Sequence, residues 1–155
     1  MADRAELILK DFRISKILSE RLLAPEQAKI GTFTINSDAK KAVFPENLEV
    51  SRAGMVSYNL SVTGFTKVKG EAGEESKEKS FSIEIEAEGR FETVGTFDLD
   101  DELTCAAALR PVILLIHALC VHHARAEADS MGYRTVRPDY QIKNMPNPIL
   151  EATQT

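Results

Sequence analysis

Apolar and polar residues alternate along much of the first two thirds of the chain. Residues 56–63 alternate strictly, and residues 81–92 continue the alternation with apolar side chains on one face and mostly glutamates on the other. A period of two with one apolar face is typical of an antiparallel strand that packs on a core and turns its other face to water. Shorter alternating runs predict strands over residues 12–15, 31–35 and 48–53.

The alternation is interrupted at positions with a chemical cause. Adjacent apolar residues at 17 and 18 shift the phase of the first strand, as a bulge or kink does. Residues 36–38 are of types that favour turns, and residues 43–45 end in a proline, so a break in the strand is predicted at each place. Gly89 predicts a bend or a close backbone approach within its strand. Residues 67–79, rich in Gly, Glu, Ser and Lys, predict a solvated hairpin loop.

The pattern becomes helical after these strands. Three aspartates between residues 98 and 101 offer N-caps for a short helix that ends at Leu109. Pro111 suits the first turn of a second helix, where its missing N–H would have no partner, and Gly132 suits the position past the end. The helix over residues 111–131 has about six turns. Its first half is apolar on every side, so part of its cover is expected from another subunit.

Strands followed by helices predict one α+β domain over residues 1–155, a four-stranded antiparallel sheet covered on one face by the long helix. Residues 1–11 are expected to form an N-terminal arm or a helical turn, and residues 141–155 a short extended tail. The length of 155 residues suits one core. With 43% hydrophobic and 28% charged residues, the composition is that of a globular chain.

Charge and cysteine content narrow the class of protein. A net charge of −5 argues against nucleic acid as the main partner, because such proteins usually present a basic patch. Cys105 and Cys120 lie in apolar helical sequence, which predicts buried free thiols and a reducing cytoplasm. The apolar run over residues 112–121 is shorter than the ~20 residues that span a bilayer, so no membrane insertion is expected.

The histidines and cysteines do not form a convincing reactive site in the sequence. His117 and His122 are five residues apart and diverge around a helix, so they are expected at an interface or a rim. Cys120 and His123 share a face, but two ligands do not make a zinc site. Catalysis by a Cys–His pair is disfavoured because Cys120 lies in apolar sequence. The chain also lacks the glycine-rich motifs that hold phosphates, so we expect no metal, no cofactor and no enzyme activity.

Several short motifs follow one another in a definite order. They are Phe12-x-Ile14-x-Lys16-Ile17, Gly89-x-Phe91, Pro111-x-Ile113-Leu114, Gly132-Tyr133 and Pro138-Asp139-Tyr140. In order and spacing, over about residues 12–142, they resemble the SecB protein-export chaperone family. Two features depart from that family. Pro146 and Pro148 interrupt the region of its second helix, and its first-strand acidic contact for the SecA motor falls at Arg21, with Glu20 beside it.

The resemblance implies an ATP-independent holdase chaperone that binds unfolded or precursor proteins for export. It also implies a cytoplasmic homotetramer, built as a dimer of dimers, and leaves contact with SecA open. The alternative is a SecB-like protein dedicated to one partner, such as an antitoxin or a single secreted client. A small enzyme or ligand-binding domain is a third hypothesis, which no motif supports.

Two sets of candidate site residues follow. Apolar residues of the irregular first half are candidates for a client-binding groove, with ordinary core positions as the alternative. They are Leu22, Leu23, Ile30, Phe33, Ile35, Val43 and Phe44. Apolar residues of the long helix are candidates for the oligomer interface, because one sheet covers only one side of a helix. They are Val112, Ile113, Leu115, Ile116, Leu119 and Cys120.

Overall fold

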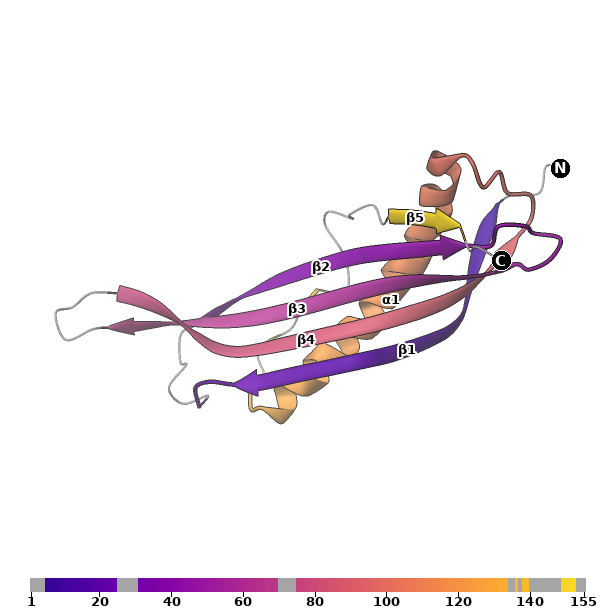
Figure 1. Ribbon diagram of the computed structural model, residues 1–155. Coiled ribbons are helices and arrows are strands. Elements are labelled where there is room, and N and C mark those ends of the chain that lie inside the picture. Colours follow the sequence, from indigo (N-terminus) through magenta and orange to yellow (C-terminus); the bar gives the residue numbers. More distant parts are fainter. Residues whose placement is uncertain are drawn as a thin grey trace.

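The computed structural model describes residues 5–24, 31–69, 75–133, 136, 138–139 and 149–152, which form a sheet with a long helix along one face (Figure 1). The elements are β1 (Glu6–Arg21), β2 (Gly31–Phe44), β3 (Ala53–Lys69), β4 (Glu75–Val94), α1 (Glu102–Ser130) and β5 (Ile149–Ala152). The strand order is β1-β4-β3-β2-β5, antiparallel except for the parallel pair of β2 and β5. The predicted α+β fold, a four-stranded antiparallel sheet under one long helix, is confirmed, and β5 extends the sheet.

The strands are longer than the sequence pattern predicts. Residues 6–11 pair with the end of β4 and do not form the expected arm. β3 and β4 continue into most of the predicted loop at 67–79, and their hairpin projects beyond the other strands (Figure 1). Pairing with a neighbouring strand therefore decides the structure of these segments, whatever their local composition.

β2 also differs from its prediction. It runs unbroken through residues 36–38, because Asn36 and Asp38 lie on its solvent face while β3 pairs with all three residues. The strand predicted over residues 48–53 is wrong in its first part, since residues 45–52 turn the chain from β2 into β3. Turn-forming residues are thus accommodated in a strand when their polar side chains can face water.

The phase shift predicted in the first strand is present as β-bulges. The register of β1 against β4 shifts between Leu9 and Asp11 and again between Ile14 and Lys16. Beyond the second bulge Ile17 and Leu18 are 37% and 50% exposed, so the end of β1 presents apolar side chains to the outside. A bulge re-aims the side chains that follow it, which explains the two adjacent apolar residues.

α1 is one continuous helix, so the prediction of two helices meeting at Pro111 is wrong. The helix begins at the Asp101 cap, whose carboxylate accepts hydrogen bonds from the backbone N–H groups of Leu103 and Thr104 at 3.1 and 3.4 Å. Pro111 lies inside it on an exposed face, where water can reach the carbonyl that the missing N–H leaves free. Gly132, at φ 92°, ends the helix as predicted.

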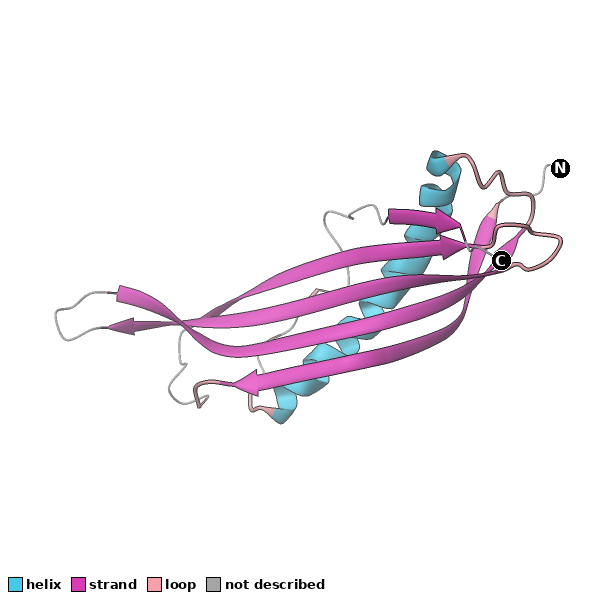
Figure 2. Cartoon of the chain, in the orientation of Figure 1, coloured by secondary structure: helices cyan, strands magenta, loops and turns pink. Residues whose placement is uncertain are grey.

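The core lies between α1 and the inner face of the sheet (Figure 2). The two layers approach each other closely at Gly89 of β4, where a Cβ would lie 2.4 Å from Ile116 Cδ1 and 3.0 Å from Leu9 Cδ1. The close backbone approach predicted at Gly89 is therefore confirmed. By length and composition α1 could cross a membrane, but in this fold it lies along the sheet and buries Leu109 and Ile113 against it.

Candidate functional site

The outer edge of β2 is the first surface with the properties of a binding site. β5 pairs with β2 only from Lys41 to Phe44, so within the described residues no strand lies beside residues 31–40 on the side away from β3. Phe33 is 36% exposed along this stretch, and Ile35 is half-buried. An open edge offers backbone hydrogen-bonding groups, and the neighbouring apolar side chains offer an apolar contact. This edge can accept an added strand from another polypeptide.

The segment after β1 places two more of the predicted client-binding residues. Leu22 is 45% exposed and Leu23 is half-buried, and the backbone N–H groups of both donate to the carbonyl oxygen of Ser80, at 2.9 and 3.0 Å. The hydroxyl of Tyr133 donates to the Leu23 carbonyl oxygen at 2.7 Å. These contacts fix the segment between β4 and the end of α1, with Leu22 facing outward.

The other predicted client-binding residues have different surroundings. Phe44 is 4% exposed and its ring packs against Phe91 and Phe97, with centroids 5.2 and 6.2 Å apart. Phe44 is therefore a core residue, which was the alternative to a client-binding role for this group of residues. Val43 is half-buried on the same strand, and Ile30 lies outside the described residues.

The outer face of α1 is the second surface with the properties of a binding site. Four of the six residues predicted at an oligomer interface are already buried within the single chain: Val112, Ile113, Ile116 and Cys120. Leu115 is 49% exposed and Leu119 is half-buried on the opposite side. Leu114, which the sequence-based set omits, is 38% exposed beside them. The spacing of 114, 115, 118 and 119 is that of one helix face, and it is the signal that could have identified this stripe.

A buried polar chain joins β3, α1 and the C-terminal segment. His117 is 2% exposed, so the prediction of an interface or rim position is wrong for this histidine. Its Nε2 lies 3.0 Å from the carbonyl oxygen of Asp139, and its Nδ1 lies 2.5 Å from the Tyr58 hydroxyl. Because a carbonyl only accepts, Nε2 carries the proton and the Tyr58 O–H donates to Nδ1. Burial lowers the pKa of His117 and raises the pKa of Tyr58.

A second contact holds the C-terminal segment at residues 138–139 against α1. Arg125 donates through Nε and Nη2 to the carbonyl oxygen of Pro138, at 3.1 and 2.7 Å. Together with the His117 contact, this bidentate bond ties residues 138–139 to the side of α1.

Both cysteines are buried, as predicted, and carry free thiols. Burial raises the pKa of Cys120 to about 12 and also raises that of Cys105, so both thiols are poor nucleophiles at neutral pH. They lie fifteen residues apart on one helix, which separates them by about 22 Å. Among the described residues no group of three or more His, Cys, Asp or Glu side chains could hold a metal ion.

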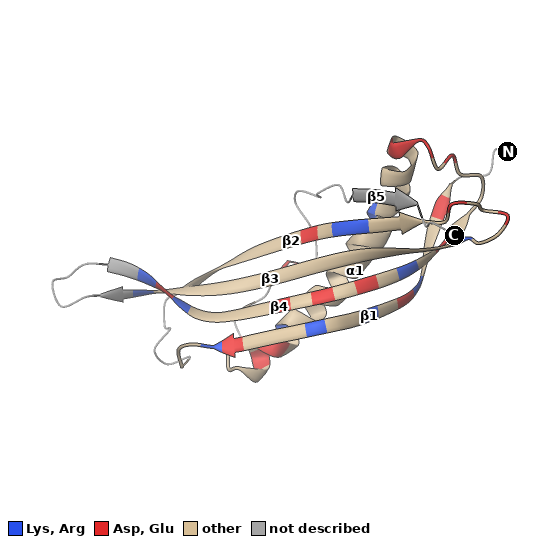
Figure 3. Ribbon diagram, in the orientation of Figure 1, with Lys and Arg blue, Asp and Glu red and all other residues tan. Residues whose placement is uncertain are grey.

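The outer face of the sheet is polar. Glu84 and Glu86 of β4 are exposed, and Glu92 forms an ion pair with Lys10 of β1 at 3.7 Å. Both acidic and basic positions lie along the strands of the sheet (Figure 3). Arg21 and Glu20, which the resemblance aligns with the SecA contact, are both exposed at the end of β1.

The chain shares its fold, an antiparallel sheet with one long helix along one face, with a solved structure of a SecB-like chaperone. Among solved structures the chain is similar to the SecB-like chaperone Rv1957 of Mycobacterium tuberculosis, in complex with a ChAD peptide from the Rv1956 HigA1 antitoxin. The TM-score is 0.64 at 11% sequence identity, covering 86% of this chain and 90% of that one. At this identity the likeness concerns the fold. No family model and no curated protein sequence matches the chain.

Proposed function

We propose that the chain is a SecB-like chaperone that holds non-native polypeptides without nucleotide. The observation that carries this proposal is the open edge of β2: on the side away from β3, no strand among the described residues pairs with residues 31–40, and Phe33 and Ile35 lie along this stretch. The fold supports it, because the similar structure is a chaperone with a bound peptide. The proposal places the protein in a reducing cytoplasm, in keeping with two buried free thiols.

The edge is suited to an unfolded chain for a physical reason. Such a chain has unpaired N–H and C=O groups as well as exposed apolar side chains. Added as a strand, it pairs its backbone with β2 and buries an apolar residue on Phe33. Full burial of a side chain of this size contributes about 1.5–3 kcal/mol to binding. Several such contacts therefore give useful affinity without nucleotide hydrolysis.

The proposal includes assembly into a homotetramer, a dimer of dimers, through the outer face of α1. Light scattering should then give a mass near four times the 17.2 kDa of one chain. Leu115→Asp should reduce this mass, since a charge buried in an interface costs several kcal/mol. Ile116→Asp is unsuitable, because Ile116 is fully buried within one chain and the variant would unfold it. A wild type that stays monomeric at micromolar concentration would contradict the assembly.

Suppression of aggregation tests the holding activity. The wild type should delay aggregation of several unrelated unfolded proteins at a stoichiometric ratio, with no nucleotide added. Phe33→Ser should weaken the effect, and Val94→Ser, at a residue of matched exposure on β4 (36% and 37%), should not. Both variants should keep the wild-type mass and melting temperature. Equal holding by both variants would argue against the β2 edge.

A chaperone dedicated to one partner is the second candidate function. The observation that favours it is the antitoxin peptide bound to the similar structure. Protein export and contact with the SecA motor belong to the first candidate alone. Capture of bound proteins from the native host separates the two: one dominant protein supports a dedicated partner, and many precursors support general export.

A further inference from the structure

β5 covers one part of the outer edge of β2. Its four residues, Ile149–Ala152, pair in parallel with Lys41–Phe44 on the side of β2 away from β3 (Figure 1). Residues 31–40 precede this stretch on the same edge, and among the described residues no strand lies beside them on that side. The proposed client site and the chain's own C-terminal strand therefore share one continuous strand edge.

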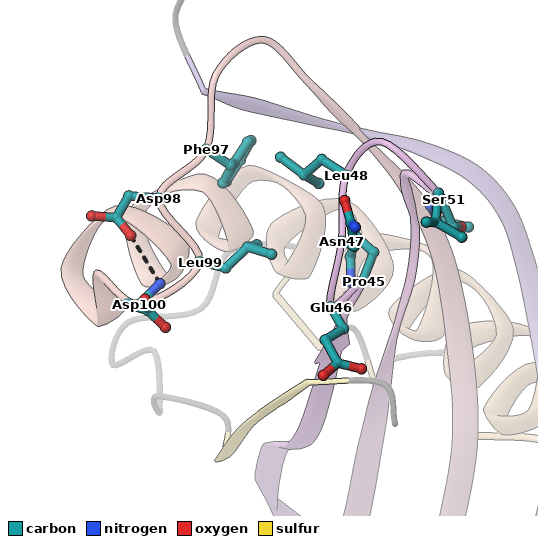
Figure 4. A pocket seen from close by; sticks show the side chains of 11 residues that line it. Pro45, Glu46, Asn47, Leu48, Ser51, Phe97, Asp98, Leu99 and Asp100 are labelled. Carbon is teal, nitrogen blue, oxygen red and sulfur yellow. Dashed lines mark hydrogen bonds between the residues drawn. The ribbon is translucent and has the colours of Figure 1, made fainter. Parts of the chain in front are cut away.

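Along this edge β5 lies between the open stretch and a pocket. Ala152 pairs with Phe44, and the loop that follows Phe44 forms one wall of a pocket of about 980 Å³. The connection from β4 to α1 forms the other wall, and Leu48, Phe97 and Leu99 point toward one another across the space (Figure 4). Without β5 the open edge would run from the start of β2 to this pocket.

The pairing of β5 with β2 is weak for physical reasons. It is parallel and four residues long, and parallel pairs are slightly less stable per residue than antiparallel ones. Pro146 and Pro148 precede β5 in the sequence, and proline has no N–H to give to a ladder, so this pairing is unsuited to extension along residues 31–40. A short edge strand of this kind separates from the sheet at a lower free-energy cost than a central strand does.

The chain before β5 is held more firmly. Val136 is buried and belongs to the core. Arg125 donates to the carbonyl oxygen of Pro138, and His117 donates to that of Asp139. Nine residues then separate Asp139 from β5. A strand on so short a connection competes for β2 at an effective concentration on the order of millimolar, and it stays tethered when it separates.

We propose that β5 is a displaceable strand, which occupies part of the client-binding edge until a long extended segment of a client replaces it. The inference rests on the proposed function and extends its site from residues 31–40 to the whole of β2, Gly31–Phe44. Three of the four residues of β5 are apolar, so β5 itself has the composition expected of a bound client segment. A short client segment would bind beside β5, whereas a long one would have to displace it.

Fluorescence anisotropy with two labelled peptides of alternating leucine and serine tests this displacement. One peptide has six residues and fits the open stretch, and the other has fourteen, the length of β2. The variant Ile149→Gly/Leu150→Ser/Glu151→Gly/Ala152→Ser replaces β5 by residues that disfavour a strand. It should bind the long peptide about three- to tenfold more tightly than the wild type does, as expected if β5 is paired in about 70–90% of molecules. Its affinity for the short peptide should not change.

A matched control makes similar changes just past β5. Thr153→Gly/Gln154→Ser lies beyond the last residue of β5, Ala152, and should alter the affinity for neither peptide.

A disulfide provides the opposite perturbation. Lys41 and Ile149 are Cα partners in the register of β2 with β5, so Lys41→Cys/Ile149→Cys should form a bond on oxidation. The oxidised variant should bind the long peptide about as tightly as the short one, and reduction should restore the preference for the long peptide. Cys105 and Cys120 are buried and should not exchange with this bond.

The outcomes separate this inference from the function it rests on. A wild type that binds neither peptide contradicts the proposed client edge itself. Binding of both peptides, with the same affinity for the long one in the wild type and the Gly-Ser variant, contradicts displacement of β5 alone. An equal gain for both peptides would also overturn it, because the short peptide has no need of residues 41–44. If the Gly-Ser variant does not fold, the comparison of the oxidised and reduced disulfide variant decides.

Discussion

Replacement of Tyr58 by phenylalanine tests the buried polar chain that joins β3, α1 and the C-terminal segment. The substitution keeps the ring, which is fully buried, and removes only the hydroxyl that donates to His117 Nδ1. Since His117 is 2% exposed, water cannot take over as donor to that nitrogen. The variant therefore removes the buried hydrogen bond to His117, together with the contact that the same hydroxyl makes with Ser37.

The expected loss follows from this geometry. Leaving a buried acceptor without its donor costs about 1–3 kcal/mol, whereas replacing both partners by apolar groups is nearly neutral. Urea unfolding at pH 7 should show the loss as a lower midpoint with an unchanged slope. The double variant Tyr58→Phe/His117→Leu should recover part of it. Wild-type stability in Tyr58→Phe would refute the proposed hydrogen-bond network.

The pH dependence of stability gives an independent check on His117. Burial lowers its pKa below the ordinary 6.5, so the folded chain keeps it neutral while the unfolded chain takes up a proton. Its contribution is thus greatest above the unfolded pKa and declines as pH falls below about 6.5, by up to about 1.4 kcal/mol per pH unit. His117→Gln should lose this part of the decline between about pH 7 and pH 5. The exposed His122 and His123 are present in both the wild type and the variant, so the difference between the two stability curves reports on His117. Parallel stability curves would contradict the argument.

Three further predictions concern the packing, the thiols and the helix cap. Gly89→Ala should destabilise the fold by about 1–3 kcal/mol, because its Cβ would lie 2.4 Å from Ile116 Cδ1, and an unchanged melting temperature would contradict that close approach. Cys120, with its pKa raised to about 12, should react with Ellman's reagent in the native protein far more slowly than after denaturation; equal rates would show that it is accessible. Asp101→Ala should cost about 1 kcal/mol in urea unfolding, whereas Asp101→Asn, which keeps a capping oxygen, should cost less.

The sequence predicts the central strands best. Residues 56–63 and 81–92 lie in β3 and β4, which have neighbours on both sides and one face on the core, so their alternation is strict. The strands at the edges of the sheet are harder to predict from the sequence. Residues 6–11 form a strand because they pair with residues far along the chain, near Val94, and no local pattern contains that partner.

The candidate surfaces could be predicted only in part. The all-apolar first half of α1 shows that it needs cover on every side, but not which side the sheet supplies, so Ile116 and Leu115 look equivalent until the helix is placed. His117 is similar, since its partners Tyr58 and Asp139 are distant in sequence. The pocket that residues 45–53 and 97–100 line could not be predicted, because its walls come from two loops that are distant in sequence.

The pairing of β1 with β4 has a consequence for how the chain folds. Arg21 pairs with Phe81 and Glu6 with Val94, so during synthesis β1 has no partner until β4 is complete. The hairpins of β2 with β3 and of β3 with β4 join neighbours in sequence and close first, because short loops lose less entropy. Docking of β1 against β4 is therefore expected to follow. During synthesis a chain proposed to protect other nascent proteins leaves its own first strand uncovered.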